Sequence, residues 1–476
     1  MRVKSVSLAP TEAAQAAGRP ALTPELLAAT GARYSRNIEG LEAILARIDP
    51  DNQDASVDTI FRMLDYGHQS IADMVPVAMF IDGISMKLAY LIWAWSPQAG
   101  GQESSTRYIK LEPEGLVDPE LLGIAAEYRS EWQETMQQAY RLYNEVETAW
   151  RVVAEENPEL LRLPAELMGD SSLKAARQIE RMRRNFAFDR SRYWLPSAAA
   201  TNVMLVMSAR AWAGLCQHLC SCNLPEAQAA GAAIREELAL GAPRLLRHAA
   251  AKESLVSGLA EEFAALVALA ASDVPETLRS GSAETAHRAG ASLAVMAPAA
   301  TGAADFAAAL RYHDNRYAWQ GAALKRSAVC FAWEAVAFGD IRDLNRHRTG
   351  NKYCPLRPLG FYAAADQLAV CHGKAGAVAL AEKVAEGAAF GRDTSRRAHE
   401  LLAAAEPVYI YWTLLGTQYS FEHVTTADKF IYEAELRTGL GAHYRYAQHL
   451  RDALEEWYKV APETRGLVLE GDAEPE

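Results

Sequence analysis

Hydrophobic residues recur at three- and four-residue spacing through most of this chain, and runs that alternate as in a strand are few and short. Such spacing places apolar side chains along one face of a helix. The longest example is LLGIAAEYRSEWQETMQQAYRLYNEVETAWRVVAEE at 121–156, which predicts a long amphipathic helix. We therefore predict an α+β fold in which helices dominate.

One apolar stretch, MVPVAMFIDGISMKLAYLIWAW at 74–95, has the length of a membrane span. Asp82, Gly83 and Lys87 interrupt it, and Pro97 follows it. A strand that leads into a buried helix explains this pattern better than a continuous lipid-facing helix. The sequence therefore predicts no membrane span here.

Small residues, mainly Ala, Gly and Ser, dominate the stretch 271–305. This shift in composition predicts a junction between a first domain at 1–270 and a second domain at 306–476. The segments 225–238 and 444–457 both place Ala-Gln at the head of an acidic and apolar helix. This similarity hints at an internal repeat on either side of the junction.

Composition narrows the possible functions. The chain has 476 residues, of which 50% are hydrophobic and 23% charged, as in globular proteins. Its formal net charge of -12 argues against nucleic acid as a partner but permits a local basic pocket. The first ten residues, MRVKSVSLAP, hold two cations without a following apolar segment, so we expect no secretory signal and a cytoplasmic location.

The cysteines raise the question of a metal site. Three of the six lie in CQHLCSC at 216–222, around His218. A single helical turn cannot easily bring three thiols and an imidazole onto one ion, and small apolar side chains are the simpler interpretation. We predict no metal and expect all six to be reduced thiols. They are Cys216, Cys220, Cys222, Cys330, Cys354 and Cys371.

A basic cluster stands out at 343–353, DLNRHRTGNKY, which holds Arg346, His347, Arg348 and Lys352. One interpretation is structural: a helix ends at Gly350, and the cations of its last turn are favoured by the helix dipole. The other interpretation is functional, because two guanidinium groups and an imidazole this close together suit phosphate or carboxylate recognition.

A second polar stretch is GGQESSTRYIKL at 100–111. Glu103, Ser105 and Arg107 stand at alternate positions, so an extended segment would project them to one side. Upstream, GARYSRN at 31–37 and FRMLDYGHQSIADM at 61–74 contribute further candidate polar residues, namely Ser35, His68 and Ser70.

Together these segments resemble the flavin-dependent thymidylate synthases. That family carries, in order, an Ala-Arg-x-Ser segment, a Gly-His-x-Ser/Thr turn, a strand into a Gly-Ile-Ser helix, the signature RHRxxSxxxxSxRY, Arg-x-x-Leu-Pro, Asn-x-Arg, Leu-Arg and an Ala-Gln helix. The first half of this chain matches these motifs in order and spacing at Ala32–Ser35, Gly67–Ser70, Gly83–Ser85, Glu103–Tyr108, Arg192–Pro196, Ser208–Arg210 and Ala227–Gln228.

The departures from the family pattern are complementary between the two halves. In the first half the Arg-His-Arg position falls within Ala94–Pro97, which has no cation, and Leu-Arg falls on His218–Leu219. The second half has an intact Arg346-His347-Arg348 and retains Arg437, but it lacks Glu-x-Ser-x-Arg and Gly-His-x-Ser. The chain thus resembles two fused copies of a flavin-dependent thymidylate synthase-like domain, each partly degenerate.

The resemblance implies reductive methylation of dUMP to dTMP, with FAD as cofactor and methylenetetrahydrofolate and NADPH as co-substrates. Arg437 would be the catalytic residue that polarises the uracil, since an arginine keeps its charge. Ser105 has no neighbouring base in the sequence that would activate it as a nucleophile. The remaining implied roles are substrate binding by Glu103, Ser105, Arg107, Arg192, Asp343 and Arg346, and FAD binding by Ser35, His68, Ser70, Arg210, Arg346, His347 and Arg348.

Members of the family are homotetramers with pockets between subunits. Since each half of this chain would stand for one family subunit, the resemblance implies a homodimer that forms a pseudo-tetramer. It also implies one composite pocket with residues from both halves. Two alternatives stay open. One is a related flavoenzyme that acts on another pyrimidine nucleotide, as Asp343 at a family Gln/Glu position suggests. The other is a non-catalytic pseudoenzyme in which the arginines only cap a helix and Arg437 pairs with Glu433.

Overall fold

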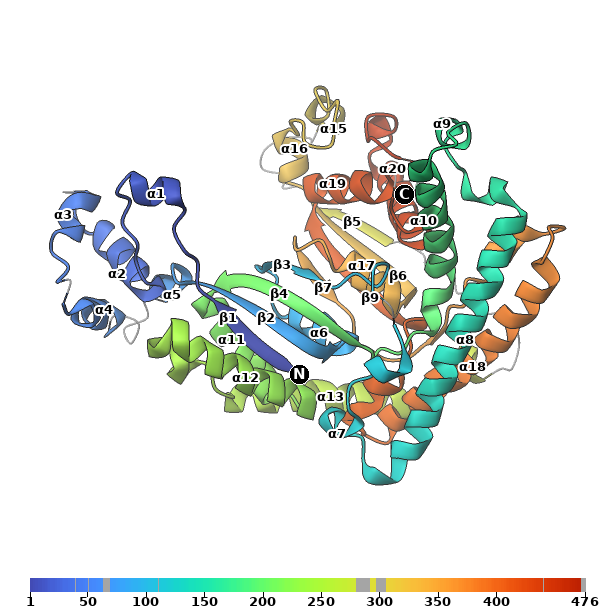
Figure 1. The fold of residues 1–476 in the computed structure, drawn as a ribbon, viewed down its shortest axis with the longest axis horizontal. Helices are drawn as coiled ribbons and strands as arrows, with labels where there is room; N and C mark the ends of the chain where they lie inside the picture. Colours follow the sequence, from blue (N-terminus) through green and yellow to red (C-terminus); the bar gives the residue numbers. More distant parts are fainter. Residues whose placement is uncertain are drawn as a thin grey trace. The chain divides into compact units, whose positions relative to one another are not determined.

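The structure is a computed structural model of the whole chain (Figure 1). It describes residues 1–38, 40–49, 51–62, 69–109, 111–279, 292–296, 305–439 and 441–471. His68 and most of the Ala-rich stretch 271–305 therefore lie outside the described residues. The boundaries proposed at that stretch stay predictions.

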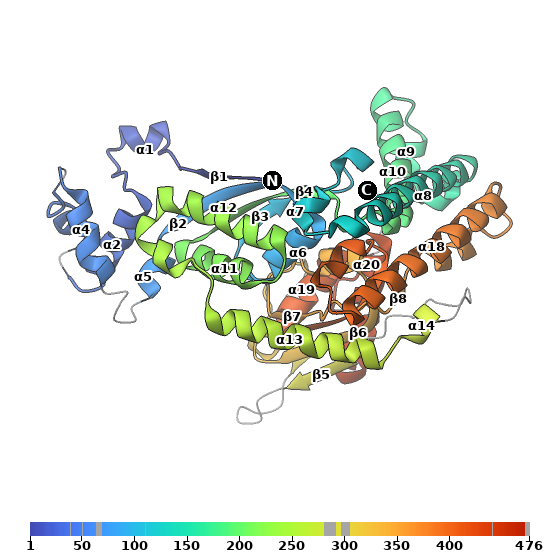
Figure 2. The same ribbon diagram turned by 90° about the horizontal axis from the view of Figure 1, so that it is seen from below.

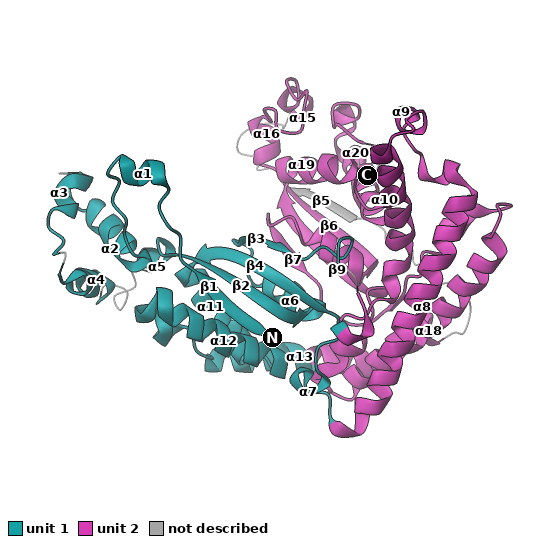
Figure 3. Cartoon of the chain, in the orientation of Figure 1, with its two compact units in different colours: residues 1–110, 115–125, 199–264 teal, residues 111–114, 126–198, 265–476 magenta. Residues whose placement is uncertain are grey.

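The chain forms two compact units that are interleaved in sequence (Figure 3). Unit 1 comprises residues 1–110, 115–125 and 199–264, and unit 2 comprises residues 111–114, 126–198 and 265–476. Unit 2 thus contains a long segment from the first half of the sequence together with nearly all of the second half. Each unit is built around one antiparallel sheet.

The sheet of unit 1 has four strands in the order β1-β2-β4-β3. In β4 half-buried or exposed residues alternate with buried ones, the pattern of a strand with one face on a core. A bulge interrupts the pairing of β2 with β4 between Asp82 and Ile84, where Gly83 adopts φ +71°, a conformation that favours glycine. The strands are β1 Arg2–Val6, β2 Pro76–Ser85, β3 Gly100–Glu103 and β4 Ala200–Ser208.

Helix α6, Met86–Ala94, follows β2 without a loop, and Ser85 caps it by accepting a hydrogen bond from the Leu88 N–H at 2.9 Å. The prediction of a strand that leads into a buried helix at 74–95 is confirmed, since eight of the nine helical residues are buried. Figure 2 shows α11 and α12 side by side in this unit. The main helices of unit 1 are α1 Glu12–Ala16, α2 Pro24–Tyr34, α3 Leu41–Leu45, α4 Gln53–Phe61, α5 Ser70–Asp73, α7 Pro119–Leu122, α11 Ala209–Ser221 and α12 Pro225–Gly241.

The sheet of unit 2 repeats this order as β5-β6-β9-β7, with β8 also paired to β9. Its second strand, β6, also carries a bulge, between Trp333 and Val336, and also leads directly into a helix, α17 Phe338–Leu344. The strands are β5 Ser292–Met296, β6 Ala328–Ala337, β7 Asn351–Tyr353, β8 Gly360–Phe361 and β9 Thr417–Thr426.

Three long helices, α8 Arg129–Glu156, α10 Leu173–Ser191 and α18 Ala377–Ala403, pack together in unit 2. The helix predicted at 121–156 is confirmed in its main part and begins at Arg129. Its buried Trp132 donates from Nε1 to the Tyr411 carbonyl at 2.9 Å. The other helices are α9 Ala165–Met168, α14 Glu276–Arg279, α15 Phe306–Ala309, α16 Ala322–Lys325, α19 Ala427–Thr438 and α20 Tyr444–Val460. The helix-dominated α+β class is confirmed.

One helix, α13 at Glu253–Ser272, is long and apolar enough by length and composition to cross a membrane. Its mean hydropathy is 1.6, and little of the helix is buried. Among the described residues it alone combines this length with this composition. The stretch considered from sequence, 74–95, is instead the strand and helix described above.

Candidate functional site

The two units divide the predicted site residues between them. Ser35, Ser70, Glu103, Ser105, Arg107 and Arg210 lie in unit 1. Arg192, Asp343, Arg346, His347, Arg348 and Arg437 lie in unit 2. Unit 2 therefore brings Arg192, from the first half of the sequence, into the same compact body as the basic cluster and Arg437, from the second half.

The centre of this group is a buried ion network around Arg192, the first residue of a 3-10 turn that follows α10. One terminal nitrogen donates to Asp343 Oδ2 at 2.8 Å and the other to Asp340 Oδ1 at 2.6 Å. The side chains of Arg192, Asp340 and Asp343 are 7%, 0% and 9% exposed. Asp340 also accepts from the Tyr193 hydroxyl at 3.2 Å, and His449 Nε2 lies 3.5 Å from its second oxygen.

These contacts keep both carboxylates ionised. Burial alone raises the pKa of Asp343, but Arg346 and Arg192 outweigh that effect and hold it well below its usual range. Burial acts in the same direction on Asp340, and His449 and Arg192 nevertheless lower its pKa to about 2. Arg192 in turn has a raised pKa, because Asp343 and the neighbouring groups outweigh the effect of burial. The network is therefore a fixed arrangement of charges at neutral pH.

The basic cluster is not a helix terminus. Helix α17 ends at Leu344, and Arg346, His347 and Arg348 lie in the connection to β7. The expected helix ending at Gly350 is wrong because the chain must turn earlier to start β7 at Asn351. Gly350 adopts φ +72° as the chain turns there, and a Cβ at this position would collide with the Val424 carbonyl of β9.

Arg346 connects the buried network to solvent. Its Nε lies 3.2 Å from Asp343 Oδ1, while its side chain is 53% exposed. A guanidinium group has five N–H donors in a planar fork, so this contact leaves donors that can reach an anionic ligand. The geometry supports the functional interpretation of the cluster for Arg346.

Arg437 projects from α19 and is oriented by His347. Its Nε donates to His347 Nε2 at 3.0 Å, and its guanidinium carbon lies 5.4 Å from the centre of the Tyr446 ring. Burial, followed by the charges of Arg437 and Lys352, lowers the pKa of His347 to about 2. The imidazole is therefore neutral, and because Nε2 accepts, its proton lies on Nδ1. His347 thus acts as an acceptor that directs the guanidinium group.

A buried titratable cluster beside Arg437 was not identified from sequence. Glu433 is 1% exposed and accepts from the Tyr446 hydroxyl at 3.2 Å, with His423 Nδ1 3.7 Å from its other oxygen. Burial raises the pKa of Glu433 although Lys352 and Tyr446 oppose this, and burial lowers the pKa of Lys352. The spacing of Glu433 and Arg437 suggested an ordinary ion pair, but in the structure Arg437 donates to His347.

In unit 1 the structure changes one expectation. Strand β3 ends at Glu103, and Ser105–Tyr108 form a turn in which the Tyr108 N–H donates to the Ser105 carbonyl at 3.0 Å. The expected extended alternation of Glu103, Ser105 and Arg107 is therefore wrong beyond Glu103. Ser105 Oγ also accepts from the Arg107 N–H at 3.3 Å, a local bond by which serine favours turns.

The other candidates of unit 1 make surface contacts. Arg210, on α11, donates to Asp73 Oδ2 at 2.8 Å, and their side chains are 50% and 44% exposed. Ser35 closes α2 and donates from Oγ to the Ala32 carbonyl at 2.9 Å. Ser70 is the first residue of α5.

The structure describes all six cysteines as free thiols, as expected. Burial raises the pKa of Cys216 to about 12 and also raises the pKa of Cys220 and Cys222. A protonated thiol is a poor metal ligand. Within the described ranges, no group of three or more His, Cys, Asp or Glu residues is arranged to hold a metal ion.

Comparison with known families adds to this geometry. Residues 21–244 match the family model described as thymidylate synthase complementing protein. This match confirms the resemblance to the flavin-dependent thymidylate synthases over this stretch. It contains the candidates from Ser35 to Arg210, including Arg192, whereas Asp343, the basic cluster and Arg437 lie beyond the matched residues.

Two known proteins are also similar to this chain. UPF0159 protein Ta1429 from Thermoplasma acidophilum is 25% identical in an alignment of 234 positions that covers 45% of this chain and 46% of that protein. The aligned part thus spans about half the length of this curated relative. A crystal structure of the UMP/dUMP methylase PolB from Streptomyces cacaoi bound with 5-Br dUMP is 15% identical. It covers 52% of this chain and 93% of that chain with a TM-score of 0.29, too low to bear on the fold.

Proposed function

We propose that this chain is a flavin-dependent thymidylate synthase-like enzyme that methylates dUMP to dTMP, with methylenetetrahydrofolate and NADPH as co-substrates. The observation that carries the proposal is the orientation of Arg437 by a neutral His347, in the same unit as the Arg192–Asp343–Arg346 network. The family match over residues 21–244 supports the same reaction class.

Arg437 is proposed to stabilise the negative charge that develops on the uracil ring. The task needs a cation that keeps its proton and is already oriented before the reaction. The hydrogen bond to His347 and the contact with the Tyr446 ring supply that orientation. Because His347 is neutral, it does not add a competing charge at this point.

Arg346 and Asp343 are proposed to bind the nucleotide, Arg346 through its exposed guanidinium group. Arg192 was expected to bind the substrate directly, and its two carboxylate contacts support a positioning role in which it fixes Asp343. Glu103, Ser105 and Arg107 are proposed as further substrate-binding residues. Asp343 and Arg192 come from different halves of the sequence, which supports a composite site.

FAD is the cofactor that the family implies, and the donors present fit its diphosphate. Arg346 supplies an exposed guanidinium group and Arg348 a half-buried one, and such groups bind phosphate oxygens in pairs. When bound, FAD would supply the hydride that completes the methyl group. His347 is proposed to contribute through its ring, and Ser35, His68, Ser70 and Arg210 are proposed as the remaining FAD-binding residues.

We also propose that the chain arose by tandem duplication. The two sheets share one strand order, and in each the second strand carries a bulge and leads directly into a helix. In each, the third strand in the order leads directly into one helix and then a second, α11 and α12 in one case and α19 and α20 in the other. The Ala-Gln pairs noted in the sequence lie in α12 and α20.

The first experiment is the absorbance spectrum of the purified full-length chain, followed by titration of the apo-protein with FAD. We expect a flavin spectrum and one FAD per chain, because only one Arg-His-Arg is present. Two equivalent sites per chain would contradict the composite site, and a colourless protein that takes up no FAD would support a non-catalytic protein.

The second experiment compares dUMP with UMP, dCMP and CMP in NADPH oxidation and product analysis. Formation of dTMP from dUMP is the expected result. Turnover of another nucleotide in preference to dUMP would instead favour a related pyrimidine-modifying flavoenzyme.

We likewise propose that two chains form a homodimer, which would contain four family-like domains. Light scattering on the active protein should give twice the mass of the 52.0 kDa chain. A monomer with full activity would remove the reason to expect a pseudo-tetramer.

A further inference from the structure

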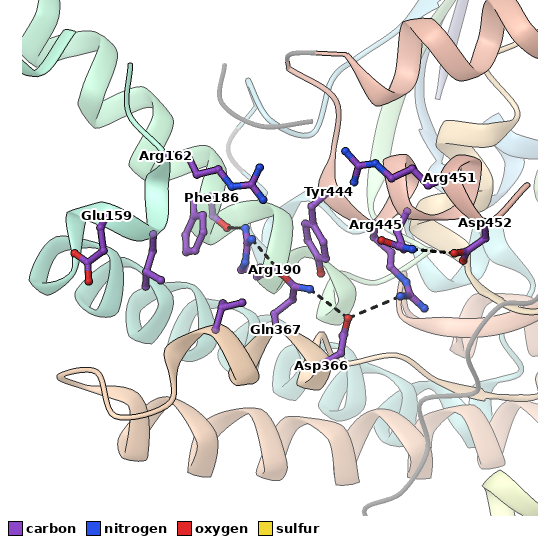
Figure 4. A pocket seen from close by; sticks show the side chains of 13 residues that line it. Glu159, Arg162, Phe186, Arg190, Asp366, Gln367, Tyr444, Arg445, Arg451 and Asp452 are labelled. Atoms are coloured by element: carbon purple, nitrogen blue, oxygen red, sulfur yellow. Dashed lines mark hydrogen bonds and ion pairs between the residues drawn. The ribbon is translucent and has the colours of Figure 1, made fainter. Parts of the chain in front are cut away.

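A polar pocket lies within unit 2, and none of the predicted site residues lines it. Its volume is about 580 Å³, which is in the usual range for small-molecule sites. Four arginines and three acidic residues contribute to its walls (Figure 4). The arginines are Arg162, Arg190, Arg445 and Arg451, and the acidic residues are Glu159, Asp366 and Asp452.

Much of the pocket wall comes from residues that share one side of a helix. Helix α20 supplies Tyr444, Arg445, Gln448, Arg451 and Asp452, which recur at three- and four-residue steps along one side. Phe186 and Arg190 are four residues apart on α10. The remaining wall comes from the 3-10 turns Pro158–Leu161 and Ala365–Cys371 and from Arg162.

Arg190 is a fixed positive charge in this pocket. It is 4% exposed, and its guanidinium carbon lies 3.6 Å from the centre of the Phe186 ring and 4.5 Å from that of Tyr444. Its terminal nitrogens donate to the Phe186 carbonyl and to Gln367 Oε1, both at 3.1 Å. Stacked and hydrogen-bonded in this way, it sets a positive potential without needing to move.

The acidic residues of the pocket already have donors. Asp366 accepts from the Tyr362 hydroxyl at 2.7 Å and from Gln367 at 3.2 Å, with Arg445 farther away at 3.8 Å. Asp452 accepts from Gln448 at 2.8 Å. Glu159 pairs with Lys374 at 2.5 Å. Four arginines stand against three acidic residues, and Lys374 already balances one of these, so the lining carries a net positive charge.

Two of the arginines are placed to meet a ligand. In the view of Figure 4 the guanidinium groups of Arg162 and Arg451 point toward each other from opposite walls, above Tyr444. Arg451 also donates to the Gly471 carbonyl at 3.2 Å, and a guanidinium group with five N–H donors can hold such a partner and an anion at the same time. Guanidinium groups that approach from several directions suit the tetrahedral oxygens of phosphate better than a planar carboxylate.

We propose that this pocket binds a small organic phosphate, at a site separate from the proposed dUMP and FAD site. The volume exceeds the needs of a single phosphate group, so the ligand carries a further organic part. Phosphate and carboxylate anions share the chemistry that arginine recognises, and the experiment must distinguish them.

The test is isothermal titration of the full-length chain with inorganic pyrophosphate and, in parallel, with citrate. Arg162→Gln and Arg451→Gln change side chains that are exposed or half-buried, so the fold should persist. Each should weaken pyrophosphate binding about tenfold or more. Arg141→Gln is the matched control, because it removes the same charge from a 61% exposed position on α8, outside the pocket.

The variant Arg346→Gln distinguishes pyrophosphate binding in this pocket from binding at the proposed active site. It should leave pyrophosphate affinity at this pocket unchanged, whereas an equal loss would place the anion at the proposed active site and overturn the inference. Unchanged affinity in both Arg162→Gln and Arg451→Gln, or no pyrophosphate binding at all, would also overturn it. Citrate that binds more tightly than pyrophosphate would overturn the phosphate class.

Discussion

Arg192 and Arg210 both come from the part of the chain that matches the family model, and both form ion pairs with aspartates, yet their surroundings differ. Arg192 is held between Asp340 and Asp343, and the three side chains are 0–9% exposed. Arg210 meets Asp73 at a similar distance, 2.8 Å, with half of its side chain in solvent. Distance alone therefore does not distinguish a structural ion pair from a surface contact.

The difference lies in solvation. An exposed pair competes with water and salt, so it contributes little to stability. In a buried network, loss of one partner strands an unpaired charge in a poorly solvated interior. The Arg192 network should therefore behave as part of the architecture that places Asp343 and Arg346, whereas Arg210 stays free to exchange Asp73 for a ligand at little cost.

Replacement of Arg192 should have the largest effect. Arg192→Met leaves the buried Asp340 without its arginine and Asp343 with only the half-exposed Arg346, and we expect the free energy of unfolding to fall by about 3–5 kcal/mol. Urea unfolding followed by circular dichroism measures this change. The triple variant Arg192→Met, Asp340→Asn, Asp343→Asn should recover much of the loss, because it removes the stranded charges. A single-variant loss below about 1 kcal/mol would show that the network is solvated like the Arg210 pair.

Arg437 should affect catalysis more than stability. Under the proposed function, Arg437→Gln removes a preorganised cation at the developing charge, and we expect kcat for dTMP formation to fall about 10²–10³-fold. Arg396→Gln, at a 46% exposed position on α18, is the matched control and should keep the activity of the parent protein. Equal activity of the two variants would remove Arg437 from the catalytic role.

Acid should remove the stability that the ionised Asp340 contributes to the buried network. The pKa of Asp340 is lowered to about 2, so its contribution is present above the ordinary aspartate pKa and is lost as pH falls toward the folded value. We expect about 2 kcal/mol of unfolding free energy to disappear between about pH 4 and pH 2. Urea unfolding at several pH values measures the slope. Asp340→Asn should flatten it, while Asp314→Asn, at an exposed position, should not.

The sequence predicted the features that depend on local pattern. Helix dominance, the strand-to-helix turn at 74–95 and the functional character of Arg346 follow from spacing and residue type, and the structure agrees on the first two. The end of α17 at Leu344 was missed because Gly350 looked like a cap, whereas its φ serves the close approach to β9.

The buried partners could not be predicted, because burial is set by residues distant in sequence. Asp340 reads as an ordinary acid in a helix, and only the packing of Arg192, from the other half of the chain, makes it part of a network. Glu433 similarly reads as a surface partner of Arg437 four residues away, whereas it lies buried against Tyr446 and His423. The arginines of the polar pocket come from segments that are adjacent only in the fold.

The smallest effect should come from the surface pair itself. In a double-mutant cycle with Arg210→Ala and Asp73→Ala, the coupling energy for unfolding should be below about 1 kcal/mol and should shrink further in added salt.

FAD binding gives the contrasting measurement, because Arg210 is a proposed FAD-binding residue. Arg210→Ala should weaken FAD binding about tenfold or more, as expected for loss of a charge-assisted contact. Asp73→Ala should leave FAD affinity unchanged or improve it, since it releases the guanidinium group from its competing carboxylate. A coupling energy of several kcal/mol, with no change in FAD affinity, would make Arg210 a structural residue like Arg192 and would erase the distinction between the two ion pairs.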